Sequence, residues 1–333
     1  MSSCSRPILL IIHLGPDPER HVYKNLKNLK NLPMETVVST DNIKLKMFCI
    51  SECIQVHDYI AQPQLTSLID GATFDPSFRN GFWRLTIERF MAFRDFHRIY
   101  PSRGVLHIES DIVLLDDFPT AIFESSSKIM WCEVGPTIDS AALFYSPSLK
   151  ESDWFIEELV SKLNLKRIFT DMTVLKKIRD DNLDRVTIFP SLKSPAELGS
   201  ELVAIDPSAL GVWLIGSDPR NLFGFTKRYQ WWELAFDYTF PIRFEFIGRW
   251  LYLIEPTRRI RILNLHNHAK NTFFFSFAKN LIIRFFVFSA SRRKLSVFPV
   301  PRYLYRFLKS QKIERIQKRH FDIIWNMIKS LFN

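Results

Sequence analysis

Gly104-Val105-Leu106-His107-Ile108-Glu109-Ser110-Asp111-Ile112-Val113-Leu114-Leu115 is the most strand-like stretch of this chain. Apolar residues stand on both sides of three polar ones, which predicts one buried strand over 104–115. Charged residues seldom interrupt a buried strand unless they are paired or bind a metal. In extended chain, Glu109 and Asp111 would point to one face, roughly 7 Å apart. The pair therefore indicates a cation site, or else an ordinary acidic passage from strand to loop.

Outward from this stretch, strand-like and helix-like segments alternate. This alternation predicts an α/β fold with a mostly parallel central sheet flanked by helices. The segment 191–199 is predicted to be a polar loop. The further strands are expected at Pro7–His13, Thr36–Thr40, Lys46–Ile50, Ala141–Tyr145 and Ile260–Leu265, and the helices at Arg20–Leu32, Phe82–Tyr100, Asp153–Leu163 and Asp171–Ile178.

Glycine is scarce, with 10 in 333 residues, and neither glycine-rich phosphate motif occurs. A bound nucleotide would therefore need its diphosphate neutralised by a cation and by basic side chains. Glu109 and Asp111 could hold the cation. Arg84, Arg89 and Lys270 are the candidates for phosphate contacts, although Arg84 and Glu88 could equally form a surface ion pair at i,i+4.

Several motifs resemble a known family. Phe82-Trp83-Arg84-Leu85-Thr86-Ile87-Glu88-Arg89-Phe90 followed by Val105–Ile112 looks like the first half of GT-A-fold glycosyltransferases, in which an Arg-bearing helix precedes a strand ending in D-x-D. Segments 205–211, 216–221 and 264–270 are similar to glycosyltransferases of polysaccharide loci. The similarity spans residues 5–272. This chain has Glu-Ser-Asp where that family has D-x-D, and the longer first side chain could reshape the metal site.

The resemblance implies a nucleotide-sugar donor, a Mn²⁺ or Mg²⁺ ion, and transfer of the sugar to a hydroxyl of a glycan or a lipid-linked acceptor. Asp111 would be the main metal ligand, with Glu109 on the metal or the ribose. His266 or His268 would complete the metal sphere, and Lys270 would face the diphosphate.

An inverting transferase also needs a carboxylate base near the acceptor. Asp171 and Asp206 are the two candidates. Asp171 could instead belong to a helix cap, and Asp206 could be turn chemistry before Pro207. Arg220, in a turn, is a candidate for a further donor contact.

The four cysteines are too few for a disulfide framework in a chain this long. Cys49, Cys53 and His57 are spaced to share one helical face, so a partial zinc site competes with reduced packing thiols. No export signal and no apolar run of 18 residues is evident. These observations predict a cytoplasmic protein.

The charge is uneven along the chain. Residues 273–333 hold 13 Lys/Arg, two acidic residues and 11 of the 30 Phe, while residues 1–272 hold 32 basic and 33 acidic residues. We expect a catalytic domain over 1–272 and a basic, Phe-rich helical tail over 273–333. The tail is predicted to rest on an anionic membrane surface at the inner face. A helix docked on the body is the main alternative, and nucleic acid is an unlikely partner.

Two other functions compete with sugar transfer. A metal-dependent phosphatase or hydrolase also uses strand-end carboxylates, but it would usually need more acidic ligands or a nucleophile with a phosphate loop. The non-catalytic alternative is a membrane-surface binding protein with a glycosyltransferase-like body, in which Glu109 and Asp111 are incidental.

Overall fold

The computed structural model describes residues 6–61, 63, 69, 81–115, 118–124, 126–164, 170–208, 210–211, 243–267 and 270. The chain divides into two compact units, Met1–Arg292 and Arg293–Asn333, and every described residue belongs to the first. The boundary expected between residues 272 and 273, and the whole tail, lie outside the described residues and stay predictions.

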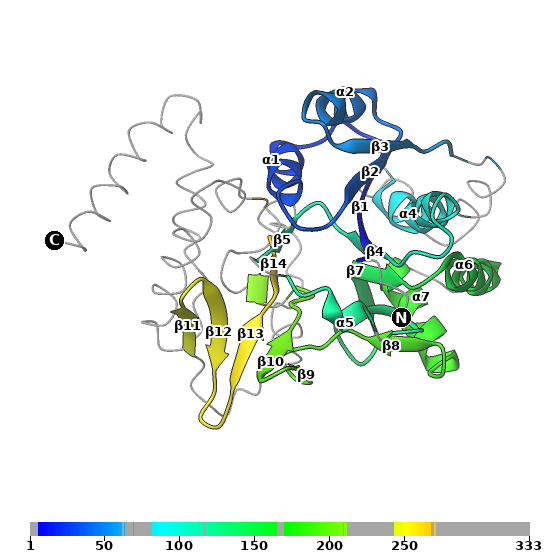
Figure 1. The fold of residues 1–333 in the computed structure, drawn as a ribbon. Coiled ribbons are helices and arrows are strands. Elements are labelled where there is room, and N and C mark those ends of the chain that lie inside the picture. Colours follow the sequence, from blue (N-terminus) through cyan, green and yellow to red (C-terminus); the bar gives the residue numbers. More distant parts are fainter. Residues whose placement is uncertain are drawn as a thin grey trace, which may run out of the picture. The chain divides into compact units, whose positions relative to one another are not determined.

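A seven-stranded sheet with the order β3-β2-β1-β4-β7-β6-β8 forms the centre of this unit (Figure 1). The first four strands of that order are parallel, β7 is antiparallel to both of its neighbours, and β8 is parallel to β6. The predicted mostly parallel sheet is confirmed. The strands are β1 (Ile8–His13), β2 (Thr36–Thr40), β3 (Gln55–Asp58), β4 (Val105–Ile108), β6 (Ile129–Glu133), β7 (Asp139–Ser146) and β8 (Val186–Ile188).

Helices cover both faces of the sheet, which confirms the layered α/β architecture. Strand β1 shows why, because Leu10 packs into one apolar cluster and Leu9 into the other, as the two-residue period of a strand requires. The described helices are α1 (Arg20–Leu29), α2 (Ile43–Ser51), α4 (Phe82–His97), α5 (Ala121–Glu124), α6 (Leu149–Asn164) and α7 (Asp171–Asp181). None of them is long and apolar enough to cross a membrane.

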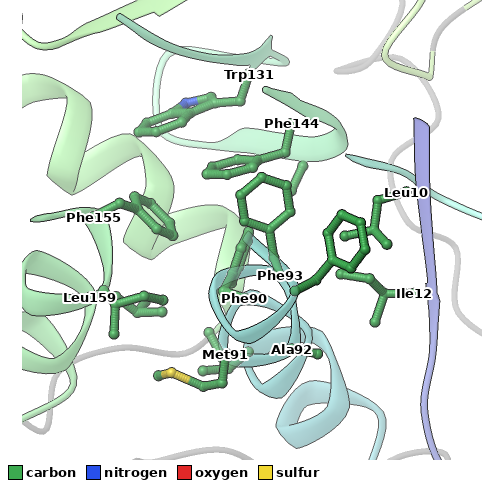
Figure 2. Close-up of a cluster of buried hydrophobic side chains, with 14 of the residues drawn as sticks. Leu10, Ile12, Phe90, Met91, Ala92, Phe93, Trp131, Phe144, Phe155 and Leu159 are labelled. Carbon is green, nitrogen blue, oxygen red and sulfur yellow. The ribbon is translucent and has the colours of Figure 1, made fainter. Parts of the chain in front are cut away.

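The cluster under α4 and α6 combines aliphatic side chains with a group of aromatic rings in contact with one another (Figure 2). Phe90 of α4 meets Phe155 of α6 edge-on at 5.2 Å between ring centres, and Trp131 of β6 stacks on Phe144 of β7 at 5.9 Å. These contacts fix the direction of α4 along the sheet. The same helix carries Arg89, whose position therefore follows from core packing.

A five-stranded sheet, β11-β12-β13-β10-β9, and a two-stranded sheet, β14-β5, complete the described fold. Their strands are β5 (Ile112–Leu114), β9 (Ala196–Leu198), β10 (Glu201–Ala204), β11 (Arg243–Ile247), β12 (Trp250–Ile254), β13 (Arg259–Ile262) and β14 (Asn264–His266).

Four predictions of single elements are wrong. The stretch 104–115 is two strands in different sheets, because the chain turns at Glu109–Asp111. The segment 260–265 is likewise divided between β13 and β14, and β9 lies inside the segment expected to be a loop.

The strand predicted at Lys46–Ile50 is helix α2. The Asn42 side chain accepts a hydrogen bond from the Leu45 amide and caps this helix. The helix ends at Ser51 and His57 lies on β3, so Cys49, Cys53 and His57 do not share a helical face. The His57 ring instead pairs with the Ser39 hydroxyl at 3.0 Å.

Candidate functional site

The Glu109-Ser110-Asp111 segment forms a turn at the carboxyl end of β4. Two features hold it. The buried Asn25 of α1 donates to the carbonyls of Ser110 and Ile112, at 2.9 and 2.8 Å. The Asn267 amide donates to the Asp111 carbonyl at 2.8 Å. The two carboxylates are thus presented by a fixed turn at the end of a central strand, where open α/β sheets bind ligands.

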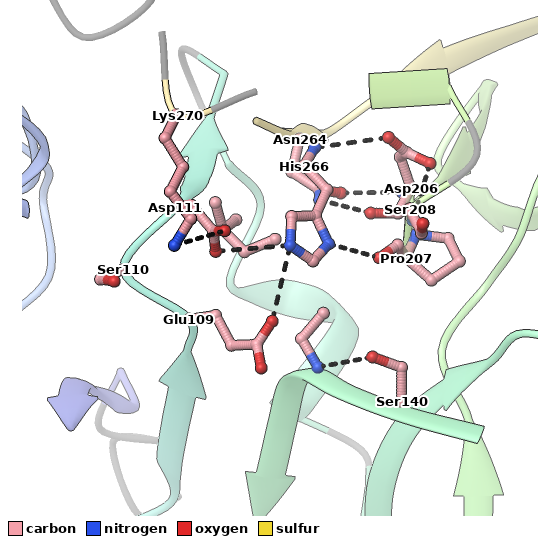
Figure 3. A network of polar contacts seen from close by, with 12 residues as sticks. Glu109, Ser110, Asp111, Ser140, Asp206, Pro207, Ser208, Asn264, His266 and Lys270 are labelled. Atoms are coloured by element: carbon pink, nitrogen blue, oxygen red, sulfur yellow. Dashed lines mark hydrogen bonds and ion pairs between the residues drawn. The ribbon is translucent and has the colours of Figure 1, made fainter. Parts of the chain in front are cut away.

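Strand β14 brings a histidine to this turn. Its antiparallel pairing with β5 sets His266 opposite Ile112, next to Asp111 in the chain. The His266 Nε2 atom lies 3.3 Å from Asp111 Oδ1 and 3.5 Å from Glu109 Oε2 (Figure 3). Two segments more than 150 positions apart in sequence therefore converge on one point.

One ligand atom from each of Glu109, Asp111 and His266 lies within 4.8 Å of the others, and no other group of three or more such side chains is found among the described residues. Two carboxylate oxygens and one imidazole nitrogen form a donor set that suits Mn²⁺ and tolerates Mg²⁺. The His266 ring is also oriented for ligation. Its Nδ1 lies 2.6 Å from the Pro207 carbonyl, so Nδ1–H donates there and Nε2 faces the carboxylates, where a metal ion would replace the Nε2 proton.

The electrostatics of the cluster favour a cation. Burial disfavours the charged imidazole, but Asp111 and Glu109 outweigh it and raise the pKa of His266 to about 9. Burial also opposes ionisation of Glu109, yet Arg89 and His266 hold its pKa below the ordinary value. The two carboxylates thus create a negative potential strong enough to hold a positive charge on a buried ring.

Arg89 connects this cluster to α7. Its guanidinium bonds Glu109 through Nη1 and Asp171 through Nη2, the latter at 2.6 Å. The charged ends are largely withdrawn from solvent, with side-chain exposures of 10% for Arg89 and 5% for Asp171. Arg89 therefore fixes the direction of Glu109. Arg84, the other arginine of α4 expected to bind donor, lies 3.8 Å from Glu88 at i,i+4.

Asp171 begins α7, and the preceding Thr170 supplies the capping side chain. The Asp171 carboxylate faces Arg89 and is withdrawn from solvent. Burial raises the pKa of Asp171 despite that arginine. The predicted role as acceptor base stays a prediction, and the observed contacts make Asp171 an anchor for Arg89.

Asp206 organises the loop that holds His266. Its carboxylate accepts from the backbone amides of Ser208, Leu210, Gly211 and His266, at 3.1, 2.9, 2.7 and 3.4 Å. Its backbone exchanges two hydrogen bonds with the Asn264 side chain. The loop packs so closely that a Cβ on Gly211 would overlap the His266 carbonyl. Asp206 is 1% exposed, and its predicted role as base stays a prediction.

Lys270 completes the rim of the site. Its Nζ lies 4.0 Å from Asp111 Oδ2, and its backbone φ is +52°, in the left-handed region that non-glycine residues seldom adopt. Such backbone conformations cluster at ligand sites. The remaining predicted site residues, His268 and Arg220, lie outside the described residues.

Comparisons with known proteins give only distant likenesses, all of them to solved structures. No protein-family model and no curated protein matches this chain. Among solved structures, the chain is similar to the apo form of the glycosyltransferase GlyE from Streptococcus pneumoniae TIGR4, with 12% identity and a TM-score of 0.36. The match covers 56% of this chain and 46% of that one, so this chain spans about half the length of that structure. At this level the likeness carries no argument about residues or activity.

Sequence reasoning found Glu109, Asp111, His266 and Lys270, which the structure brings together. It missed Asn25 and the carbonyl of Pro207. Asn25 lies among apolar residues of an amphipathic helix, and a buried amide at such a position is a signal that a polar backbone segment lies opposite. A backbone carbonyl leaves no signal in sequence.

Proposed function

We propose that this chain is a glycosyltransferase that moves a sugar from a nucleotide-sugar donor to a hydroxyl of a glycan or lipid-linked acceptor, assisted by Mn²⁺ or Mg²⁺. The observation that carries the proposal is the convergence of Glu109, Asp111 and His266 at the carboxyl end of β4, with Lys270 beside them. This is the edge at which an open α/β sheet receives a nucleotide. A cation held there would lie against the donor diphosphate.

When bound, the metal would act as a Lewis acid that stabilises the departing nucleoside diphosphate. Asp111, Glu109 and His266 would hold it. Lys270 would direct its ammonium group toward the diphosphate and share the negative charge that develops there. The Arg89 guanidinium keeps Glu109 ionised and directed at the cluster, which also explains how a Glu serves where the resembled family has an Asp.

Asp171 and Asp206 have their carboxylates engaged by Arg89 and by backbone amides. In the proposed mechanism they are positioning residues, one for Arg89 and one for His266. A base for the acceptor hydroxyl would then come from another group, or a retaining reaction would need none at that position.

A thermal-shift panel of nucleotide sugars and nucleoside diphosphates, each with and without Mn²⁺, tests the proposal. A ligand that binds only the folded chain raises its apparent stability by mass action. We expect a shift that requires both Mn²⁺ and one nucleotide and that disappears in Asp111→Asn. The matched control is Asp180→Asn, an exposed helix-surface carboxylate paired with Lys176. No shift with any pair, in protein shown to be folded, would overturn the donor site and favour the non-catalytic alternative.

The location of the enzyme is part of the proposal. We place it at the inner face of a membrane, held by the basic, Phe-rich segment 273–333. Such a segment binds anionic lipid through both its charge and its aromatic side chains. Binding of the full chain to vesicles containing phosphatidylglycerol, but not to phosphatidylcholine vesicles, is the expected result. Vesicle binding that persists unchanged after removal of 273–333 would contradict this use of the tail.

A further inference from the structure

Helix α2 carries an exposed apolar stripe. Ile43, Met47 and Ile50 are 67%, 60% and 62% exposed, and they are three of the seven large hydrophobic side chains found exposed among the described residues. Their spacing of four and three residues puts them on one face of the helix. The opposite face is buried through Leu45 and Cys49. Single exposed apolar residues are ordinary, but three in one stripe mark an interaction surface.

The stripe faces away from the body of the unit. Helix α2 packs on β2 and β3 at one end of the central sheet, beside α1 (Figure 1). The ring of Phe48 contacts Tyr23 of α1 edge-on, with the ring centres 4.7 Å apart. With α1 on one side and β3 beneath, the face bearing Met47 is turned outward. The Asn42 cap fixes the start of the helix, so the stripe is a rigid feature.

Lysines border this stripe. Lys44 and Lys46 lie on its two sides along α2, and Lys27 and Lys30 extend from α1 toward the end of the same helix, where both bond Glu52. Lys44 pairs with Asp17, and Lys46 with Asp58, but these partner carboxylates are largely exposed. Exposed pairs of this kind contribute little and exchange easily, so the ammonium groups can bind other anions. The chain as a whole has a formal charge of +10.

The size of the patch argues against a second copy of the chain. A stable dimer buries about 800 Å² per partner, whereas three aliphatic side chains offer on the order of 300 Å². A lipid surface has no such minimum. Aliphatic side chains flanked by lysines are the pattern of a helix that lies in the headgroup region, with the apolar face in the acyl boundary and the ammonium groups on phosphates.

We propose that α2 is a membrane-docking helix, which inserts Ile43, Met47 and Ile50 into an anionic bilayer surface while Lys44 and its neighbouring lysines contact lipid phosphate. None of these residues belongs to the tail or to the candidate donor site. The inference goes beyond the proposed function and does not depend on transfer activity.

A local fluorescent probe tests the docking of α2 in the full chain. Cys4 and Cys53 are replaced by Ser, which leaves the buried Cys49 and Cys132, and a single Cys is then introduced by Met47→Cys or by Leu183→Cys. Leu183 is the matched control, because it is 66% exposed and does not belong to a stripe of exposed apolar side chains. With an environment-sensitive NBD label and vesicles containing phosphatidylglycerol, we expect a blue-shifted, several-fold brighter emission at position 47, quenched by nitroxide-labelled lipid, and no change at position 183.

Three outcomes would overturn the proposal. The chain could bind vesicles while the probe at position 47 behaves like that at position 183. The chain could fail to bind phosphatidylglycerol vesicles at all. The emission at position 47 could shift with protein concentration in the absence of lipid, which would make the patch a contact between copies.

A triple variant provides a second measurement. Ile43→Ser, Met47→Ser and Ile50→Ser together are expected to weaken vesicle partitioning at least about tenfold, because each removes apolar area from the lipid contact. The control is Ile99→Ser with Leu183→Ser, which should leave partitioning unchanged. The metal-dependent nucleotide shift should survive in both variants, so a failure of docking and a failure of the donor site give different results. Unchanged partitioning in the triple variant would overturn the proposal.

Discussion

Two clusters of this molecule, one around Asp139 and one around Asp111, contain carboxylates that are largely withdrawn from water beside cationic side chains. They differ in the contacts that the carboxylate oxygens make. Asp139 is 0% exposed, and its two oxygens accept from Arg179 at 2.7 and 2.9 Å and from the Trp131 indole at 2.9 Å. The carboxylates of Glu109 and Asp111 instead stand 3.5 and 3.3 Å from the same nitrogen of His266.

This difference separates a structural ion pair from a ligand site. In the first cluster, the Trp131 indole and two nitrogens of Arg179 each donate to Asp139 at hydrogen-bond distance, so the carboxylate is fully used by protein donors. In the second, three potential ligand atoms converge at distances longer than ordinary hydrogen bonds, with a raised histidine pKa as a sign of excess negative potential. The first cluster should therefore matter for stability and the second for ligand binding, and this distinction can be tested.

The largest effect is expected from Asp111→Asn. Loss of one anionic ligand should lower Mn²⁺ affinity more than about 100-fold, beyond the range seen when only outer partners of a metal ligand are lost. Titration of free Mn²⁺ by electron paramagnetic resonance measures it. The free energy of unfolding without metal should fall little, since Asp111 also repels Glu109. Asp180→Asn is the control. An unchanged Mn²⁺ affinity in folded Asp111→Asn would remove Asp111 from the ligand set.

The opposite profile is expected from Asp139→Asn. It leaves the largely buried Arg179 without its main counter-charge and should lower the free energy of unfolding by about 3 kcal/mol, measured by urea denaturation. Asp181→Asn serves as the control, because Asp181 pairs with Lys162 and Lys177 nearer the surface and its loss should cost less than about 1 kcal/mol. The Mn²⁺ affinity of the folded protein should not change. A loss of affinity without a loss of stability would reverse the distinction between the clusters.

A third comparison concerns two buried histidines, His97 and His107, which should matter for stability, as Asp139 does. Burial lowers the pKa of His97 to about 4 and that of His107 to about 3, so both are neutral when the chain is folded. Below the unfolded pKa of 6.5 the unfolded chain binds more protons, so stability falls as pH drops from 6.5 through about 4 for His97. The loss for His97 should be on the order of 2 kcal/mol at pH 5.

The measurement is urea denaturation of the wild type and of His97→Gln between pH 5 and 7.5. The Gln side chain keeps a hydrogen-bonding group near Ser152 but cannot be protonated, so its variant should show a shallower dependence on pH. Equal slopes in the two proteins would show that His97 does not contribute to acid sensitivity.

The sequence predicted those features that depend on residues close together in the chain. Glu109 and Asp111 stood out because charge is rare in a buried strand, and β1, β2 and α4 follow from their apolar periods. The turn at Glu109–Asp111 was not predictable in the same way, since apolar residues continue on both sides of it. What breaks the strand is pairing of β5 with β14, more than 150 positions away in sequence. That same pairing brings His266 to the site.

Helix α2 shows a second kind of limit. Its residues 43–47 alternate apolar and basic side chains, and over so short a range this period of two favours a strand. The structure resolves the pattern as a helix with one buried and one exposed apolar face. A helix that is apolar on opposite sides has no amphipathic period to detect, and the proposed lipid contact would account for its outer stripe.

The smallest effect, and the one that sharpens the comparison most, is expected at Lys270. Lys270→Gly and Lys270→Ala both remove the ammonium group and should weaken diphosphate binding about tenfold, the value of one charged hydrogen bond. They differ in the backbone, because φ of +52° is strained for Ala and relaxed for Gly. The Gly variant should therefore be more stable than the Ala variant by about 1 kcal/mol, measured by urea denaturation without ligand. If the two variants bind diphosphate equally but differ in stability, the backbone at this position is strained, and the strain is retained because the lysine side chain is needed there. Equal free energies of unfolding for the two variants would mean that the left-handed backbone at Lys270 is not strained, and that the rim of the site is no more strained than the rest of the fold.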